Sequence, residues 1–292
     1  MLERLKYNSH IDDKGAIMNK LGKQKRVQVV AALVEGASVN GVARMTGVTK
    51  QTILRLLADL GGACGRYQDE KLRSLPCKRV QADEIWAFCF AKDKNLPEEL
   101  KGKFGFGSVW TWTAICADTK LIVSWLVGER SAPYAIKFMD DLASRLANRV
   151  QLTTDGHKPY LEAVEGAFGS QIDYAMLEKL YTNPPSEGAT RYSPAQCCGT
   201  KTRKIMGNPD GQHISTSYAE RMNLTIRMMN RRFTRLTNAH SKKVANHIHF
   251  LNLTFMWYNF ARINQALRIT PAMAAGVSDH VWSLEEIIGL LD

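Results

Sequence analysis

The sequence predicts an α/β fold in which a mixed five-stranded sheet flanked by helices follows a small all-α domain. Three observations predict it. Apolar residues recur with helical spacing up to residue 60, and strand-like patterns begin at residue 79. Strand and helix patterns then alternate through residue 177. Hydrophobic residues make up 45% of the 292 residues, enough for a core that needs no disulfide framework.

The chain is strongly basic, with a formal net charge of +11. Such an excess usually indicates a polyanionic partner, either nucleic acid or an anionic membrane surface. No run of about 20 apolar residues is present, and residues 1–13 contain no apolar run typical of a signal peptide. We therefore expect a cytoplasmic protein that acts on DNA or RNA and does not enter a membrane.

The six cysteines do not have the spacing of a zinc ribbon or knuckle. We interpret them as reduced thiols, several of them in the core. A structural zinc that joins Cys64 and Cys77 to distant ligands is the minor alternative.

The first 62 residues divide into two parts. Residues 1–17 show little periodicity, and we interpret them as a disordered arm or an upstream extension before a start at Met18. Residues 18–62 contain three helical runs broken at Gly36 and Gly47, and the last run extends to Leu60. Two short helices joined by a glycine-containing turn predict a helix-turn-helix. Its outward positions would form a DNA-reading surface, and they are Lys50, Gln51, Thr52 and Arg55. A plain helical bundle with solvated polar positions is the alternative.

Residues 63–78 are interpreted as a linker, and residues 79–240 as a catalytic domain. Its predicted strands cover residues 79–90, 106–117, 121–127, 150–153 and 172–177, and the first three form an antiparallel meander. Predicted helices cover residues 131–148, 160–168 and 216–236. Residues 183–214 are rich in Pro, Gly, Ser and Lys and are interpreted as a flexible insertion. A C-terminal helical tail over residues 241–292 begins with a helix over 245–265. The order of strands and helices is that of ribonuclease-H-like domains.

Two aspartates have the positions of metal ligands. Asp83 lies within an apolar strand, where a carboxylate costs free energy unless it is paired or binds a metal. Glu84 is expected on the opposite face because side chains alternate along a strand. Asp155 follows a short strand directly. Each aspartate taken alone is equally typical of a turn or a helix N-cap.

Glu220 begins a helix that is otherwise basic. Residues 221–243 contain seven basic residues and no acidic one. Helical geometry places Glu220, Arg227 and Arg231 within about 40° of one another, opposite the apolar face. This pattern favours a metal ligand beside a phosphate track. A glutamate that only stabilises the helix dipole is the alternative.

Other enzyme classes lack their motifs. There is no Gly-x-Ser-x-Gly elbow and no Gly-x-x-x-x-Gly-Lys-Ser/Thr loop. His157 and His213 lie close in sequence to Asp155 and Glu220, and we interpret them as candidate contacts to a scissile phosphate.

Three blocks of the sequence resemble the insertion-sequence-1-type bacterial transposases of the DDE class. They are QADEIWAFC around Asp83, LTTDGHKPYLEAV around Asp155, and SYAERMNLTIRMMNRRFTRLTNAHSKK around Glu220. The segment YNFARINQALRITPAMAAG is similar to a C-terminal signature of many such enzymes. The blocks are specific in combination, and the resemblance covers about residues 20–276.

The resemblance implies a ribonuclease-H-like fold and two Mg²⁺ ions, with Mn²⁺ as a possible substitute, held by Asp83, Asp155 and Glu220 as catalytic ligands. It implies that Arg221 and Asn223 contact DNA. The implied partners are double-stranded terminal inverted repeats and target DNA, bound by a homodimer or higher oligomer at the bacterial nucleoid. Some relatives carry an N-terminal zinc motif that this chain lacks, so end recognition would rest on the helix-turn-helix.

Two alternatives remain open. A ribonuclease-H-like nuclease or resolvase would cut DNA without strand transfer. A catalytically dead repressor would bind inverted repeats without any metal-dependent activity.

Overall fold

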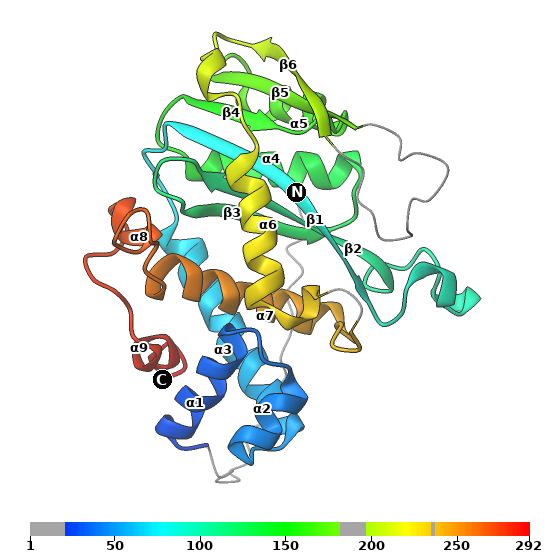
Figure 1. Ribbon diagram of the computed structural model, residues 1–292, viewed down its shortest axis with the longest axis vertical. Coiled ribbons are helices and arrows are strands. Elements are labelled where there is room, and N and C mark those ends of the chain that lie inside the picture. The colour runs from blue at the N-terminus through cyan, green and yellow to red at the C-terminus, as the bar shows by residue number, and fades with distance from the viewer. Residues whose placement is uncertain (1–20, 182–196, 235–236) are drawn as a thin grey trace, which may run out of the picture.

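The computed structural model describes residues 21–181, 197–234 and 237–292. The proposed extension of residues 1–17 and the start at Met18 lie outside the described residues. The fold is mixed α/β, with a six-stranded sheet flanked by helices (Figure 1). The strands are β1 (Arg79–Cys89), β2 (Gly107–Cys116), β3 (Ile122–Gly128), β4 (Val150–Thr154), β5 (Ile172–Tyr181) and β6 (Cys197–Met206). Among the described residues, no helix has the length and apolar character needed to cross a membrane.

The sheet has the order β3-β2-β1-β4-β5-β6. The predicted meander is confirmed, because β2 pairs antiparallel with both β1 and β3. β4 lies parallel to β1, and β5 lies parallel to β4. The helix α5 (Pro159–Phe168) is the crossover that parallel pairing of β4 and β5 requires. The ladder between β1 and β4 covers only residues 79–81 of β1, so the strand continues well beyond its parallel neighbour.

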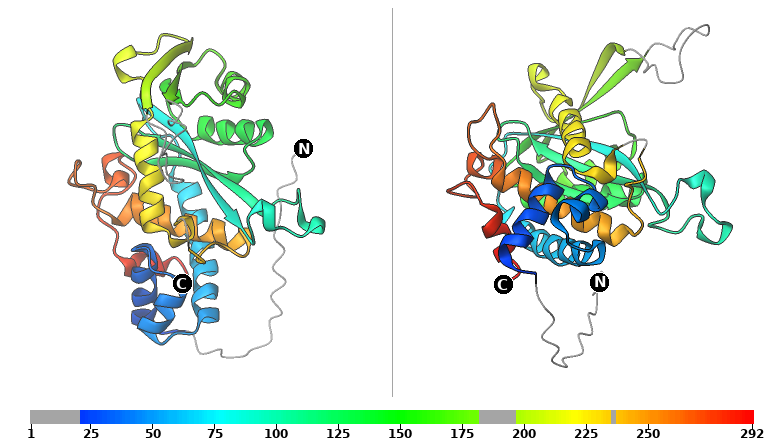
Figure 2. Two further views of the ribbon diagram at one scale, coloured as in Figure 1. Left: turned by 45° about the vertical axis from the view of Figure 1, so that its right-hand side comes forward. Right: turned by 60° about the horizontal axis from the view of Figure 1, so that its bottom comes forward.

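Helices cover both faces of the sheet. One face packs against α5 and α4 (Ala132–Arg145), through buried side chains such as Trp112, Phe138 and Tyr160. The other face packs against α6 (Ser217–Met229) and α7 (Val244–Met256), through residues such as Ile85, Met222 and Phe255. Figure 2 shows α6 and the pair α4 and α5 on opposite sides of the sheet.

The sixth strand corrects the prediction of five strands and of a flexible insertion over residues 183–214. β6 forms the antiparallel partner of β5 at the edge of the sheet. Most of its side chains are exposed, so it shows no alternation of buried and exposed residues. A strand without an apolar face gives no periodic signal in the sequence. Residues 182–196 of the predicted insertion lie outside the described residues.

The N-terminal helices are α1 (Lys23–Val34), α2 (Val39–Thr46) and α3 (Lys50–Lys71). Ser38 and Thr49 cap α2 and α3 with their hydroxyl oxygens. However, α3 does not end at Leu60, and much of the predicted linker is helical. A Cβ on Gly61 would lie 2.2 Å from the carbonyl oxygen of His249 on α7. The glycine therefore permits close contact between two helices and does not end the first one.

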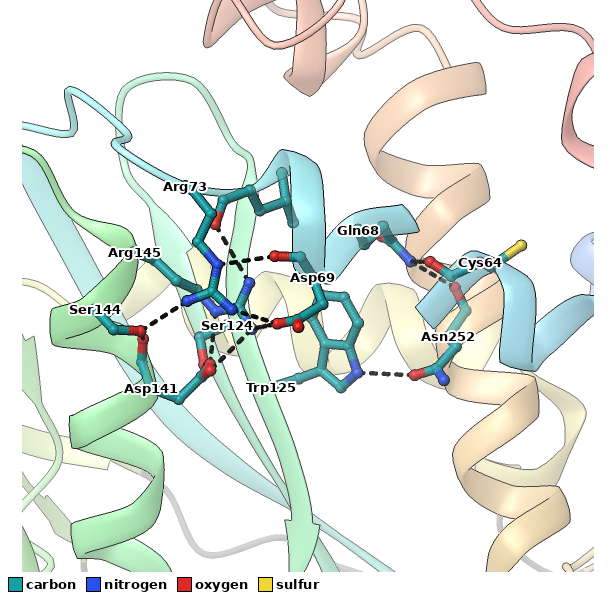
Figure 3. A network of polar contacts seen from close by, with 11 residues as sticks. Cys64, Gln68, Asp69, Arg73, Ser124, Trp125, Asp141, Ser144, Arg145 and Asn252 are labelled. Carbon is teal, nitrogen blue, oxygen red and sulfur yellow. Dashed lines mark hydrogen bonds and ion pairs between the residues drawn. The ribbon is translucent and has the colours of Figure 1, made fainter. Parts of the chain in front are cut away.

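Polar contacts join α3 to the helices and strands of the sheet (Figure 3). The buried guanidinium of Arg145 on α4 donates to Asp141 at 2.6 Å and to Asp69 of α3 at 2.7 Å. The amide of Asn252 on α7 donates to the carbonyl of Gly61 at 3.1 Å and accepts from the Trp125 indole at 3.0 Å. These contacts hold the N-terminal helices against the sheet and its covering helices.

Both long C-terminal helices are shorter than predicted. α6 ends at Met229, because the buried Asn230 leaves helical geometry and donates from its amide to Thr254 on α7. α7 ends at Met256 and continues as a single π-helical segment over Trp257–Ala261. There the Asn259 amide bonds both backbone groups of Ile122, which fixes this segment to β3. Two short helices follow, α8 (Pro271–Ala274) and α9 (Leu284–Gly289).

Two adjacent glycines test the contact between α3 and α7. Gly61→Ala should lower the free energy of unfolding by about 1–3 kcal/mol, because its methyl group overlaps the His249 backbone. Gly62→Ala is the matched control, since its Cβ finds its nearest neighbour, the Arg66 guanidinium, at 3.6 Å. The control should gain up to about 1 kcal/mol from helix propensity. Urea unfolding of both variants measures this, and equal stabilisation of the two would contradict the proposed contact.

Candidate active site

An open cavity of about 950 Å³ contains all three carboxylates singled out in the sequence, Asp83, Asp155 and Glu220. Asp83 lies in β1, Asp155 directly follows β4, and Glu220 lies in the first turn of α6. Gln81 of β1 pairs with Thr153 of β4 in the parallel ladder. Asp83 and Asp155 each lie two residues further along the sequence, so they are level with each other. The register of β1 and β4 therefore brings together two aspartates that are far apart in the sequence.

Asp83 is held from two sides. Its Oδ1 accepts from the Glu84 backbone N–H at 2.8 Å, and its Oδ2 accepts from the Asn223 amide at 2.8 Å. Asn223 lies on α6 and is buried, and its own Oδ1 is buried without a hydrogen-bond partner in the described part of the chain. The DNA contact that the resemblance implied for Asn223 stays a prediction, and in the structure the Asn223 amide bonds Asp83.

Asp155 is oriented by the loop after β4 and by an arginine. Its Oδ1 accepts from the His157 backbone N–H at 2.9 Å. Arg130, which follows β3, donates to Asp155 Oδ2 at 3.3 Å and to Glu84 Oε2 at 3.0 Å. The same guanidinium lies 5.0 Å from the centre of the Trp110 ring. Arg130 thus bridges two carboxylates that would otherwise repel each other.

Glu84 lies on the face of β1 opposite Asp83, as expected, because it contacts Tyr160 of α5 whereas Asp83 accepts from Asn223 of α6, yet its carboxylate still meets the aspartates. Asp83, Glu84 and Asp155 each offer a carboxylate oxygen, and these oxygens lie within 4.8 Å of one another. The Glu84 side chain is 1% exposed, and the Tyr160 hydroxyl lies beside its carboxylate. β1 has no parallel neighbour beyond Gln81, and Arg130 bonds both Glu84 and Asp155 at the open end of the ladder. This cluster of hard oxygen donors has the chemistry to bind a divalent metal.

Glu220 lies in the same cavity but outside this group of three. Lys179 of β5 forms an ion pair with its Oε2, and Thr216 donates to its Oε1 at 2.6 Å. The helix that carries it is attached to β1, because the buried Gln81 side chain accepts from the backbone N–H groups of Tyr218 and Ala219. Gln81 therefore sets the position of Glu220 relative to Asp83.

Basic residues surround the carboxylates, and they are Arg130, Lys158, Lys179 and Arg227. Among the predicted DNA contacts, Arg227 and His157 line the cavity, while Arg221 faces a different hollow on the other side of α6. Arg231 follows the end of α6 and lies outside the cavity lining. The His157 ring packs against Trp112, with ring centres 5.8 Å apart, and burial lowers its pKa.

The predicted DNA-reading surface lies away from the acidic cavity. Lys50, Gln51 and Arg55 are exposed on the first two turns of α3, and Thr52 is half-buried. In Figure 1 this end of α3 lies at the opposite end of the molecule from β4 and β5.

Burial and mutual repulsion change the acidity of the cluster. Burial, with a smaller contribution from the nearby Asp155 and Glu220 carboxylates, raises the pKa of Asp83 to about 6. Burial also raises the pKa of Glu84 to about 7, and Arg130 only partly offsets the effect. A cation placed among these groups would favour their ionised forms.

Four residues of the site gave no usable signal in the sequence: Gln81, Glu84, Arg130 and Lys179. Glu84 lies on the face opposite Asp83, which gave no reason to expect its carboxylate beside the aspartates, and the remaining three are ordinary polar positions in strands or turns. Their roles depend on contacts between residues 41–137 positions apart, such as Arg130 with Glu84, Lys179 with Glu220 and Gln81 with Tyr218. The cysteines are free, as expected, and four of the six are buried.

Comparison with protein-family models gives no match, and comparison with curated proteins gives none either. Among solved structures, the fold shows a distant similarity to the piggyBac transposase in a synaptic complex with hairpin DNA. The two chains share 10% identity, with a TM-score of 0.30 and coverage of 87% of this chain and 56% of that one. This chain therefore spans just over half the length of that protein.

The raised pKa values predict how stability depends on pH without metal. The folded state retains protons on Asp83 and Glu84 at pH values where the unfolded chain has released them. The free energy of unfolding should therefore fall as the pH rises from about 5 to 8. Asp83→Asn should remove about 1–2 kcal/mol of this fall. Urea unfolding in EDTA at both pH values measures it.

The control for this measurement is Glu98→Gln, whose parent side chain is 84% exposed. It should keep the pH dependence of the original protein. An Asp83→Asn variant with that same dependence would show that Asp83 is not held in a buried, partly protonated state.

Proposed function

We propose that this protein is a transposase of a bacterial insertion sequence, related to the insertion-sequence-1 type, which cleaves DNA at terminal inverted repeats and transfers the strand to a target. The observation that carries the proposal is the clustering of the Asp83, Glu84 and Asp155 carboxylates at the end of the β1–β4 ladder. Glu220 and a basic rim lie in the same cavity. The strand order β3-β2-β1-β4-β5 supports a ribonuclease-H-like domain, to which β6 is an addition.

The donor set suits Mg²⁺ or Mn²⁺, because it consists of carboxylate oxygens. Asp83 and Asp155 would hold the metal between them, and Glu220 would complete a second position. When bound, a pair of divalent ions activates the attacking oxygen and neutralises charge on the leaving oxygen.

The other side chains of the cavity have complementary roles. Arg130 orients Asp155, Asn223 orients Asp83, and Gln81 places the turn of α6 that carries Glu220. Lys158 and Arg227 line the cavity at positions suited to the phosphates on either side of the scissile bond. The Lys179 ammonium neutralises Glu220, and its charge is then available to a DNA phosphate when Glu220 turns towards a metal.

The exposed positions on α3 support end recognition. Ser38 and Thr49 cap two helices separated by Gly47 in the left-handed conformation, and the second helix presents Lys50, Gln51 and Arg55 to solvent. This is the arrangement of a helix-turn-helix. Because a transposon has two ends, the working complex contains at least two copies of the chain.

Substitution of the carboxylates tests the catalytic assignment. Asp83→Asn, Asp155→Asn and Glu220→Gln should each lower metal-dependent end cleavage by about 10³-fold or more, which corresponds to about 4 kcal/mol of transition-state stabilisation. Glu162→Gln, on the exposed side of α5, is the control and should keep full activity. The assay uses labelled duplexes that carry the element's own ends, with Mg²⁺ or Mn²⁺, and scores both nicked and joined products.

The product pattern separates the proposal from its two alternatives. Joined products that need all three carboxylates support a transposase. Cleavage without joining indicates a nuclease or resolvase of the same fold. Tight end binding without cleavage by the original protein indicates a catalytically dead repressor.

Arg55→Ala tests the reading surface on its own. It should weaken binding to the inverted repeats by about 5- to 150-fold, the range of one specific base contact. Binding to unrelated duplexes should change much less. Gel-shift titration at constant salt measures both, and a uniform loss on all sequences would assign Arg55 to the phosphate backbone instead.

A further inference from the structure

A second cavity, of about 940 Å³, opens along β1 beyond the carboxylates. We call it the aromatic groove and define it by Trp86, Phe88, Phe90, Lys92, Arg232 and His240. The aromatic residues belong to the far end of β1 and the residue that follows it. Arg232 and His240 belong to the segment between α6 and α7, and this segment is joined to β1 where the Phe90 N–H donates to the Ser241 carbonyl at 2.8 Å.

The rings in the groove form a row. The Trp86 and Phe88 centres are 5.8 Å apart with their planes inclined by 35°, and the Phe88 and His240 centres are 4.5 Å apart with planes inclined by 32°. The Trp86 indole donates to the Ser108 hydroxyl at 2.9 Å, which holds the ring in place. Trp86 is nevertheless 36% exposed and Phe90 41% exposed. Rings that are oriented but uncovered offer flat apolar faces to a planar ligand.

The groove is also cationic. Lys92, Lys94, Arg232 and Lys242 line it, and no acidic side chain does. Arg232 donates to the Ser241 hydroxyl at 3.1 Å, while its Nε is buried without a hydrogen-bond partner in the described part of the chain. No carboxylate forms an ion pair with Arg232 among those residues. A largely buried cation without a counter-charge favours an anionic ligand.

The groove and the acidic cavity lie along the same strand. β1 contributes Asp83 and Glu84 to the acidic cavity and Trp86 to the groove. At about 3.3 Å per residue, Trp86 lies roughly 10 Å along the strand from Asp83. That length corresponds to a few nucleotides of a single strand, so a DNA chain with a phosphate at the carboxylates can reach the rings.

We propose that the aromatic groove binds unpaired nucleotides of the DNA substrate, with bases stacked on Trp86 and Phe88 and phosphates paired with Lys92 and Arg232. Sequence-independent binding of single strands uses this combination of stacking rings and a cationic groove. Bases inside a duplex do not expose their faces, so the rings distinguish unpaired ends from paired DNA. The assignment of the ligand to the DNA substrate rests on the proposed function, whereas the binding of single strands does not.

The test measures the affinity of the full chain for a labelled oligothymidylate of about 12 nucleotides and for a duplex of equal length, by fluorescence anisotropy in EDTA. Trp86→Ala should weaken single-strand binding by about 5-fold or more and leave duplex binding within about 2-fold. Trp86→Phe should restore it. Phe104→Ala is the control, because Phe104 is similarly exposed but lies outside the groove.

A second variant changes the charge of the groove without disturbing the packing of its aromatic rings. Lys92→Gln combined with Lys242→Gln removes two exposed charges from the groove and should weaken single-strand binding and reduce its dependence on salt. Unchanged single-strand binding in both variants would overturn the proposal, and so would equal losses for single strand and duplex. Polyglutamate that competes as well as the oligothymidylate would overturn it in favour of an acidic protein partner.

The proposed transposase activity and the proposed single-strand binding in the groove can be contradicted independently of each other. Because the binding assay excludes metal, a groove that binds single strands in a protein without cleavage activity would overturn only the proposed transposase. Conversely, a protein that cleaves and joins ends, but whose Trp86→Ala and Lys92→Gln/Lys242→Gln variants both bind single strands normally, would overturn only the groove.

Discussion

Electrostatic repulsion among buried carboxylates is the constraint on which the rest of this site depends. Asp83, Glu84 and Asp155 are held within 4.8 Å of one another, and burial raises the pKa values of the first two. Such an arrangement costs free energy unless positive charge compensates it. Arg130 supplies part of that charge from one side. A divalent cation would supply the remainder, and the stability that the cluster costs in the free state would then be regained on binding.

The sheet makes this arrangement possible because its parallel ladder is short. β4 pairs with only three residues of β1, and the aspartate that follows it lies level with Asp83 at an open strand edge. The same edge continues to Trp86 and the aromatic groove. α6 crosses this region with its first turn fixed by Gln81, so Glu220 enters the cavity from a separate element. A single strand thus carries candidate metal ligands, their structural support and a candidate surface for unpaired DNA.

Sequence patterns predicted the elements that have an apolar face. The meander, β4, α4 and α5 were placed within a few residues, because burial on one side imposes a period of two or 3.6. Sequence patterns missed an element or misplaced its end where something other than a buried apolar face decided the local structure. β6 is an exposed edge strand without a period, α3 continues through Gly61 because a neighbouring backbone needs the space, and α6 stops where Asn230 bonds Thr254.

By itself the sequence determined the α/β class, the basic charge and the three carboxylates singled out as candidates. These depend on local composition, on periodicity and on a charged residue in an apolar strand, and all of them can be recognised along the chain. Only the tertiary structure decided that Glu84 joins the aspartates, that Arg130 bridges them, that Asn223 supports Asp83, and that Arg221 faces away. Those contacts link residues brought together by strand register and helix packing. Neither constraint leaves a periodic mark on the individual polar residues that meet there.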